Sequence, residues 1–271
     1  MSETNPDDLE NRRIPKEEWK GYVTRVTNDM KEYTKQFVTP ISKVIDHNTG
    51  EAWGTGNYLE LHKQRYLLTN EHVAEALKSN PLGHQFLNTD SVFRATQPFD
   101  YFKWPLDVAV SPIEEKVWAT EPHGSVPIPE SKFALAHAPV DAEVLFLKGF
   151  KAAMVPFLFD TLITNATSYG CQEIPIPPDD HRLNPRFHFA LDYRPDSTTS
   201  LDGRDLPTPD GFSGSLVWNT RFVEMSINRQ PWDANCAQVT GLVWGWPSSR
   251  ACLVATRIEY IRSFLLRAVT A

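Results

Sequence analysis

Three side chains, His72, Asp107 and Ser213, lie in settings that suit nucleophilic chemistry. His72 comes just after an apolar, strand-like run at residues 66–69, and Asp107 directly precedes another at residues 108–110. A serine hydroxyl is not acidic at neutral pH and needs a neighbouring base, for which the ordinary pKa of histidine is suitable. A carboxylate beside the histidine would hold its tautomer and stabilise the imidazolium that forms. These residue types predict a serine nucleophile activated by a histidine–aspartate pair.

Glycines flank the predicted nucleophile in the sequence Gly211-Phe212-Ser213-Gly214. Glycine lets the backbone turn tightly, which would aim two backbone N–H groups at the point where an oxyanion develops during acyl transfer. Each of the three segments is common by itself. Their order along the chain, His, Asp, Ser, strengthens the prediction because it matches one of the known orders of such triads. Asp100 is the alternative carboxylate.

The segments around these residues are short β-type runs separated by turn residues. Prolines account for 21 of the 271 residues, above the typical ~5%, and many fall within 122–139 and 175–209, which we interpret as loops. Short strands without alternating helices predict an all-β barrel or sandwich. The predicted strands are residues 38–45, 56–61, 66–69, 108–111, 142–149, 187–191, 215–218, 239–244 and 253–256.

The two ends of the chain differ from its middle. Residues 1–14 are polar and acidic, which predicts a disordered lead-in. Apolar residues recur every three or four positions over residues 15–37 and again over 258–268, and this spacing predicts two amphipathic helices. We expect the N-terminal helix to dock on the main body. The alternative is that residues 15–37 bind a regulatory protein partner.

Composition limits the classes of partner and compartment. The formal net charge of −7 argues against nucleic acid or an anionic membrane as the main partner. The three cysteines form no CxxC pair, so neither a disulfide framework nor a zinc ribbon is predicted. The sequence shows no apolar leader and no run of roughly 18 apolar residues, which predicts a cytoplasmic protein that does not enter a membrane.

Together these motifs resemble the trypsin-like (chymotrypsin-fold) serine proteases of the intracellular bacterial type. Residues 67–73 are similar to the family's histidine motif, with Asn70-Glu71 in place of two alanines. Residues 106–110 are similar to its aspartate strand, and residues 211–215 to its Gly-Asp-Ser-Gly-Gly motif. Further matches follow in the family's order, so that the resemblance runs from about Val38 to Ala268; they lie at residues 54–56, 241–245 and 255–258.

The resemblance implies two six-stranded antiparallel β-barrels in a peptidase domain, residues 38–271, with the catalytic groups in the cleft between the barrels. His72 would be the general base, Asp107 its orienting carboxylate and Ser213 the nucleophile of an endopeptidase. The N–H groups of Gly211 and Ser213 would form the oxyanion hole. No cofactor or metal is implied, and the substrate would be a protein or peptide. Proteases resembling this one often process a single partner protein, for instance in bacterial stress or anti-phage defence.

Two positions depart from the family's pattern. Phe212 stands where secreted members carry an aspartate, which pairs with a new N-terminal amine after zymogen cleavage. Phenylalanine cannot form that ion pair, so we expect a site that is assembled as translated or gated by a partner. Ser215 replaces the second glycine of the motif and adds a small uncharged side chain.

The resemblance also implies which residues bind substrate. Pairing with the substrate backbone would involve Val243, Trp244 and Gly245. Pro207 would lie at the floor of the pocket for the P1 side chain, and Leu253 would fill part of that pocket. This implies a shallow apolar pocket that prefers small or medium uncharged residues. The alternative is that a shifted loop places Asp202, Asp205 or Asp210 at the floor, where a carboxylate would select Arg or Lys.

Other functions remain open. A protease fold that has lost its activity would act as a binding or scaffold module, and a third reading is hydrolysis of a small ester or lipid. A metal site built from His181 and His188 with Asp179 and Asp180 is disfavoured, because their spacing in a proline-rich loop matches no known ligand pattern.

Overall fold

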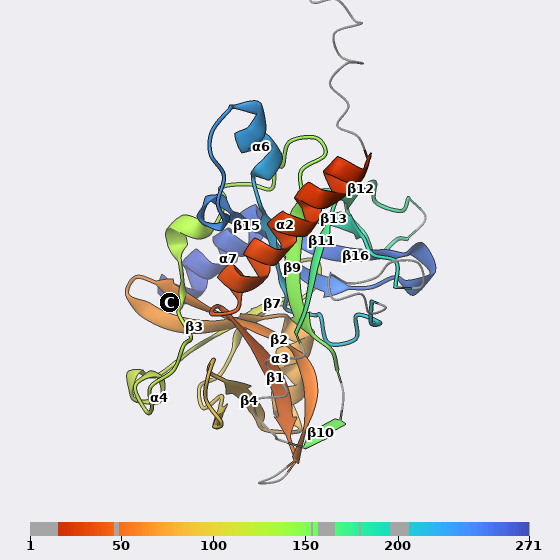
Figure 1. Cartoon of the computed structure of the whole chain (residues 1–271). Helices are drawn as coiled ribbons and strands as arrows, with labels where there is room; N and C mark the ends of the chain where they lie inside the picture. Colours follow the sequence, from red (N-terminus) through yellow and green to blue (C-terminus); the bar gives the residue numbers. More distant parts are fainter. Residues whose placement is uncertain are drawn as a thin grey trace, which may run out of the picture.

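The computed structural model describes residues 16–45, 49–152, 154–156, 166–178, 180–195 and 206–270. The predicted lead-in at residues 1–14 lies outside these ranges, as do Asp179, Asp202 and Asp205. Within them the chain forms two curled, largely antiparallel β-sheets, with one helix before the first strand and another after the last (Figure 1). The predicted all-β class with terminal helices is confirmed.

The first sheet has the strand order β5-β4-β1-β2-β3-β7-β6, and both β10 and β8 pair with β2. The β2–β8 pairing is parallel and the other pairings are antiparallel. Its strands are β1 (Val38–Val44), β2 (Thr49–Leu61), β3 (Gln64–Thr69), β4 (Leu82–Gln85), β5 (Val92–Arg94), β6 (Asp100–Phe102), β7 (Val108–Pro112), β8 (Ile128–Pro129) and β10 (Met154–Pro156).

The second sheet is antiparallel, with the order β11-β9-β14-β15-β16-β13-β12. Its strands are β9 (Leu145–Phe150), β11 (Ala166–Cys171), β12 (Glu173–Ile174), β13 (His188–Asp192), β14 (Leu216–Asn219), β15 (Gln238–Gly245) and β16 (Cys252–Arg257). In the described ranges, the main path of each sheet thus has seven strands, where the resemblance implied six. Among the strands that the sequence did not predict, β5, β6 and β12 are too short to show an alternating pattern.

Successive strand residues bury against different cores. On β3, Leu67 packs inside the first sheet with Ile41, whereas Leu68 joins a core shared by both sheets and the terminal helices. On β14, Val217 packs inside the second sheet and Trp218 joins the shared core. Side chains alternate between the faces of a strand, so a strand that is buried on both faces appears as a continuous apolar run. This arrangement explains why the strands next to the predicted site are apolar without alternation.

The N-terminal helix α2 (Lys16–Thr34) lies across β9 and β11 of the second sheet (Figure 1). Its Val26 and Met30 side chains are fully buried in the shared core, and Tyr33 lies edge-on to Trp218 with 6.0 Å between ring centroids. The expected docking on the main body is therefore observed, although the helix ends at Thr34 where we predicted residue 37. Binding of a partner to this segment remains a prediction.

The C-terminal helix α7 (Ile258–Thr270) packs against β15 and β16. None of the helices in the described ranges has the length and apolar character needed to cross a membrane. The shorter helices are α3 (Glu71–Ala74), α4 (Glu115–Trp118), α6 (Phe222–Ile227) and the 3₁₀ turns η1 (Glu75–Lys78), η2 (Glu130–Lys132), η3 (Ala234–Cys236) and η4 (Ser248–Arg250).

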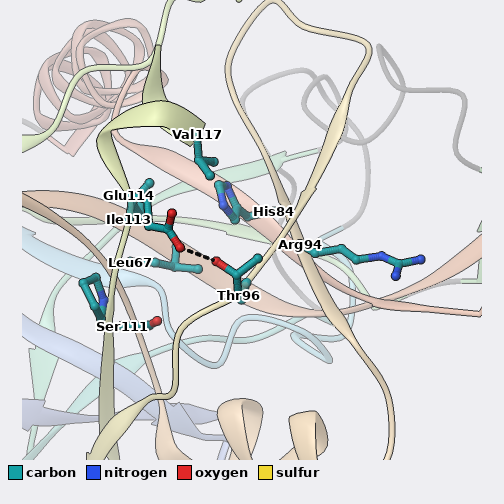
Figure 2. A pocket seen from close by; sticks show the side chains of 10 residues that line it. Leu67, His84, Arg94, Thr96, Ser111, Ile113, Glu114 and Val117 are labelled. Carbon is teal, nitrogen blue, oxygen red and sulfur yellow. Dashed lines mark hydrogen bonds between the residues drawn. The ribbon is translucent and has the colours of Figure 1, made fainter. Parts of the chain in front are cut away.

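The first sheet contains a buried histidine. His84 lines a small pocket beside Val117, and the carboxylate of Glu114, which lines the same pocket, accepts from Thr96 (Figure 2). The Nδ1 atom of His84 is 2.9 Å from the hydroxyl of Tyr58. Burial without a charged partner lowers the pKa of His84 from 6.5 to about 4.

We expect acid to destabilise the fold through His84. The unfolded chain binds this proton more tightly than the folded one, so the full stability is present above pH 6.5 and is lost as the pH falls towards 4. The total loss is about 3 kcal/mol. In thermal unfolding, His84→Asn should flatten the dependence of Tm on pH in this window. His62→Asn, at an exposed position, is the control and should leave the dependence unchanged. Equal slopes for the wild type and His84→Asn would contradict the assignment.

Candidate active site

His72 and Asp107 come from the adjoining ends of two neighbouring strands. His72 lies on α3, which begins immediately after β3, and Asp107 directly precedes β7. Because β3 and β7 are antiparallel, with Thr69 opposite Ala109, the end of one strand lies beside the start of the other. The sheet therefore brings together two residues that are 35 positions apart in the sequence.

The carboxylate of Asp107 forms two bonds to His72. Its Oδ2 atom is 2.6 Å from Nδ1 of the imidazole, and its Oδ1 atom accepts the backbone N–H of His72 at 3.0 Å. Donation from Nδ1 to the carboxylate leaves Nε2 as the basic nitrogen. The side chain of Asp107 is 13% exposed and that of His72 is 43% exposed, so the carboxylate is enclosed while the imidazole reaches the cleft.

The backbone around Asp107 is held in an unusual conformation. Asp107 has φ of 45°, in the left-handed region that Asp and Asn tolerate better than most residues. Its carbonyl accepts the side-chain amide of the fully buried Asn70 at 2.6 Å. The alternative carboxylate, Asp100, is exposed on β6 and forms no hydrogen bond or ion pair with another described residue.

The loop that carries Ser213 is a tight double turn. The N–H of Phe212 bonds to the carbonyl of Pro209, and that of Ser215 to the carbonyl of Phe212, each at 2.9 Å. Gly214 has φ of +92°, and a Cβ at this position would lie far inside contact distance of the carbonyl oxygen of Thr55. Only glycine satisfies both constraints, which is the physical reason for the Ser-Gly pair.

The peptide that precedes Gly211 is oriented by a neighbouring loop. The carbonyl of Asp210 accepts the N–H of Ala152 at 2.6 Å, and in a trans peptide the following N–H, that of Gly211, points the opposite way. Among the described residues, no acceptor bonds to the N–H of Gly211 or of Ser213. Within the described ranges, two N–H donors of the loop that carries Ser213 are thus without acceptors. Their role as an oxyanion hole remains a prediction.

A cleft with about 840 Å³ of open space, its mouth to solvent included, contains both His72 and Ser213. The Ser213 hydroxyl donates to the carbonyl of Trp244 across a long 3.5 Å. No hydrogen bond joins Ser213 and His72 within the described structure; such bonds are often long in unliganded enzymes and tighten when substrate binds. The cleft therefore contains both the predicted base and the predicted nucleophile, without a hydrogen bond between them in the described structure.

Four of the five residues predicted to bind substrate line this cleft, namely Val243, Trp244, Gly245 and Leu253. Pro207 is not among its lining residues, and its carbonyl instead accepts the hydroxyl of Tyr193 at 2.7 Å. Sequence reasoning missed Trp53, Pro209 and Ala152, which also line it. The position of Trp53 directly before Gly54-Thr55-Gly56 is the signal that could have indicated it.

Phe212 anchors the serine loop in the apolar core of the second sheet. Its ring is fully buried and lies edge-on to Tyr193, with 5.8 Å between centroids. It packs with Leu147 and Leu191, among others, in a cluster of apolar side chains. The serine loop is thus held at Phe212 by hydrophobic packing.

Ser215 fits because a glycine faces it. Its side chain is fully buried, with no hydrogen-bond partner for Oγ among the described residues, and a Cβ on Gly149 would collide with that oxygen. We expect Gly149→Ala to destabilise the fold by about 1–3 kcal/mol through overpacking. Part of this loss should return in Gly149→Ala/Ser215→Ala, since the second change removes the colliding atom. Chemical denaturation of the wild type, the two single variants and the double variant measures the coupling energy between positions 149 and 215. Strictly additive losses of stability would contradict the contact.

Two of the four residues of the disfavoured metal site, His188 and Asp180, have other partners. Nε2 of His188 is 2.7 Å from the carbonyl of Pro105, and Nδ1 accepts the N–H of Asn184 at 3.1 Å. Asp180 forms a bidentate pair with Arg182, which holds the pKa of that carboxyl at about 2. Burial lowers the pKa of His188 below its ordinary value. Both ring nitrogens are engaged, so this histidine is not free to ligate a metal.

Comparisons with known proteins give only distant likenesses. No family model and no curated protein matches the sequence. Among solved structures, the active form of the Rv3671c protease from M. tuberculosis is 18% identical, with a TM-score of 0.49 over 90% of this chain and 85% of that one. The MamO protease domain from Magnetospirillum magneticum is 10% identical, with a TM-score of 0.49 over 85% of this chain and 95% of that one. The VesB protease of Vibrio cholerae is 13% identical, with a TM-score of 0.49 over 86% and 64%. Function is therefore inferred from the geometry of the site.

Proposed function

We propose that this protein is a serine endopeptidase in which Ser213 is the nucleophile, His72 the general base and Asp107 the carboxylate that orients the base. The observation that carries the proposal is the pair of hydrogen bonds that the Asp107 carboxylate accepts from His72, on a cleft that also contains Ser213. This arrangement leaves Nε2 of the imidazole free to accept a proton on the side of the cleft.

In the proposed reaction, Ser213 Oγ attacks the carbonyl carbon of the scissile peptide while its proton passes to Nε2 of His72. The carbonyl oxygen becomes an oxyanion that accepts the N–H groups of Gly211 and Ser213. Collapse of this intermediate breaks the C–N bond, and His72 returns the proton to the departing amine. Water then attacks the acyl-serine ester by the same route and frees Ser213. Asp107 stays ionised and stabilises the imidazolium.

A fluorophosphonate probe tests the proposal directly. The probe phosphonylates a serine only where a base and an oxyanion site are assembled around it. Mass spectrometry of the labelled full chain should find the adduct on Ser213. A folded wild-type chain that takes up no label would favour the second candidate, a protease-fold binding module. The observation in favour of that candidate is the Ser213 hydroxyl, which bonds to the Trp244 carbonyl and not to His72.

We expect the cleft to prefer small or medium uncharged P1 side chains, such as those of Ala, Val, Thr or Leu. Leu253, Val243 and Phe212 line the cleft and are all buried, which gives an apolar wall. Profiling with a P1-randomised peptide library measures the preference. Shortening a wall residue, as in Leu253→Ala, should shift the preference towards larger residues such as Phe by about 10-fold.

The control for Leu253→Ala is a substitution at the neighbouring residue of β16. Val254 is equally buried but packs in a different cluster, so Val254→Ala should leave the P1 preference unchanged. A clear preference of the wild type for Arg or Lys would contradict the apolar pocket and point to Asp202, Asp205 or Asp210, of which Asp210 lines the cleft.

We also propose that the enzyme acts in the cytoplasm on a protein substrate, as part of a bacterial defence or stress response. Support for the compartment comes from Cys171, Cys236 and Cys252, which are all free thiols, as expected in a reducing environment. Residues 15–37 remain the proposed contact for a regulatory partner.

A further inference from the structure

Thr55, a fully buried residue of β2, connects the first sheet to the serine loop of the second. Its backbone N–H donates to the carbonyl of Ser213 at 2.8 Å. Its hydroxyl donates to the carbonyl of Gly211 at 2.9 Å and accepts the N–H of Phe150 at 3.0 Å. One residue thus bonds to both ends of the Gly211–Ser213 segment and to the strand end beside it.

These bonds determine where the N–H of Gly211 points. Gly211 has φ of +92°, and glycine by itself samples a wide range of backbone angles. The peptide before it is held by the Ala152 N–H on the Asp210 carbonyl, and the peptide after it by the Thr55 hydroxyl on its own carbonyl. With both flanking carbonyls bonded, neither peptide plane is free to rotate, and the N–H of Gly211 keeps its direction, opposite to the Asp210 carbonyl.

We propose that the Thr55 hydroxyl is a positioning group for the oxyanion-binding N–H of Gly211, and that it acts through the Gly211 carbonyl without touching substrate. The inference rests on the proposed function. Without the hydroxyl, the carbonyl of Gly211 and the N–H of Phe150 lose their shared partner, and the donor beside Ser213 is no longer held in its productive direction.

The chain offers a matched control for a purely structural role. Thr39, on the neighbouring strand β1, is also fully buried, and its hydroxyl donates to the carbonyl of Gln85 at 2.8 Å and accepts the N–H of Gln85 at 2.9 Å. It forms the same kind of bond pair as Thr55, yet none of its bonds reaches the serine loop. Thr39→Val and Thr55→Val therefore remove equivalent hydroxyls, only one of which is linked to Gly211.

The experiment compares the full-length wild type with Thr55→Val, Thr55→Ser and Thr39→Val, each confirmed as folded by circular dichroism. The readouts are the second-order rate constant for labelling by a fluorophosphonate probe, and kcat and KM for the best peptide of a P1-randomised library. Misplacing a group by about 1 Å can cost about 10²-fold. We expect Thr55→Val to lose about 10- to 100-fold in labelling rate and in kcat, with KM little changed. Thr55→Ser and Thr39→Val should stay within about threefold of the wild type, because a hydroxyl is retained in the first and the serine loop is untouched in the second.

If the probe labels the wild type, equal labelling rates for Thr55→Val and Thr39→Val would overturn the positioning role while leaving the proposed function in place. A loss in Thr55→Val that Thr55→Ser does not restore would also overturn it. A folded wild type that is never labelled at Ser213 would overturn the proposed function and this inference with it. Should Thr55→Val not fold, Thr55→Ala makes the same test, because it also removes the hydroxyl but does not place a methyl group where the hydroxyl stood.

Discussion

Ser213→Ala and His72→Ala should each lower peptidase activity by about 10⁴-fold or more, because the members of a triad act as a unit. Without the Ser213 hydroxyl no acyl-enzyme forms, and without His72 the hydroxyl keeps its proton. Both side chains face the cleft, so the fold should tolerate either truncation. Activity is measured as cleavage of a labelled protein substrate, and fluorophosphonate labelling should disappear in both variants.

Ser215→Ala is the matched control for the first of these changes. Ser215 lies in the same loop, but its buried hydroxyl has no partner among the described residues, so its removal should leave activity and Tm near wild type. Full activity in purified Ser213→Ala would rule out Ser213 as the nucleophile.

Asp107→Asn should lose about 10⁴-fold in kcat while keeping the fold. An asparagine can still accept the backbone N–H of His72 through its oxygen, but its amide then donates to Nδ1 of the imidazole. That donation moves the ring proton to Nε2 and leaves no base facing Ser213. The φ of 45° at this position is tolerated by asparagine, so the loss should come from the tautomer and not from backbone strain.

The control for this change is Asp100→Asn, since Asp100 is exposed on β6. It should be as active as the wild type, and thermal unfolding of both variants checks that the fold is kept. The opposite result, an active Asp107→Asn and an inactive Asp100→Asn, would transfer the role of orienting carboxylate to Asp100.

Local sequence patterns determined the elements and the separate motifs. The three- and four-residue spacing of apolar side chains predicted the terminal helices, and short apolar runs between turn residues predicted the strands that precede His72 and follow Asp107. These signals are readable because periodicity and turn chemistry depend on residues that are close in the chain. The short strands β5, β6 and β12 carried no such signal.

Only the tertiary structure decided how the motifs meet. The His72–Asp107 pair spans 35 positions and the bond from Thr55 to Gly211 spans 156, and no local pattern encodes which strand ends lie together. Pro207 is a second example of a position that the local sequence did not determine. The resemblance implied that Pro207, six residues before Ser213, lies at the floor of the pocket, but Pro209 lines the cleft and the carbonyl of Pro207 accepts the hydroxyl of Tyr193. A fixed offset along a chain holds only while the loop keeps its length and course. Here the course of the loop is determined by the burial of Phe212 in the core of the second sheet and by its hydrogen bonds to β2 of the first, which form only when the two sheets have packed together.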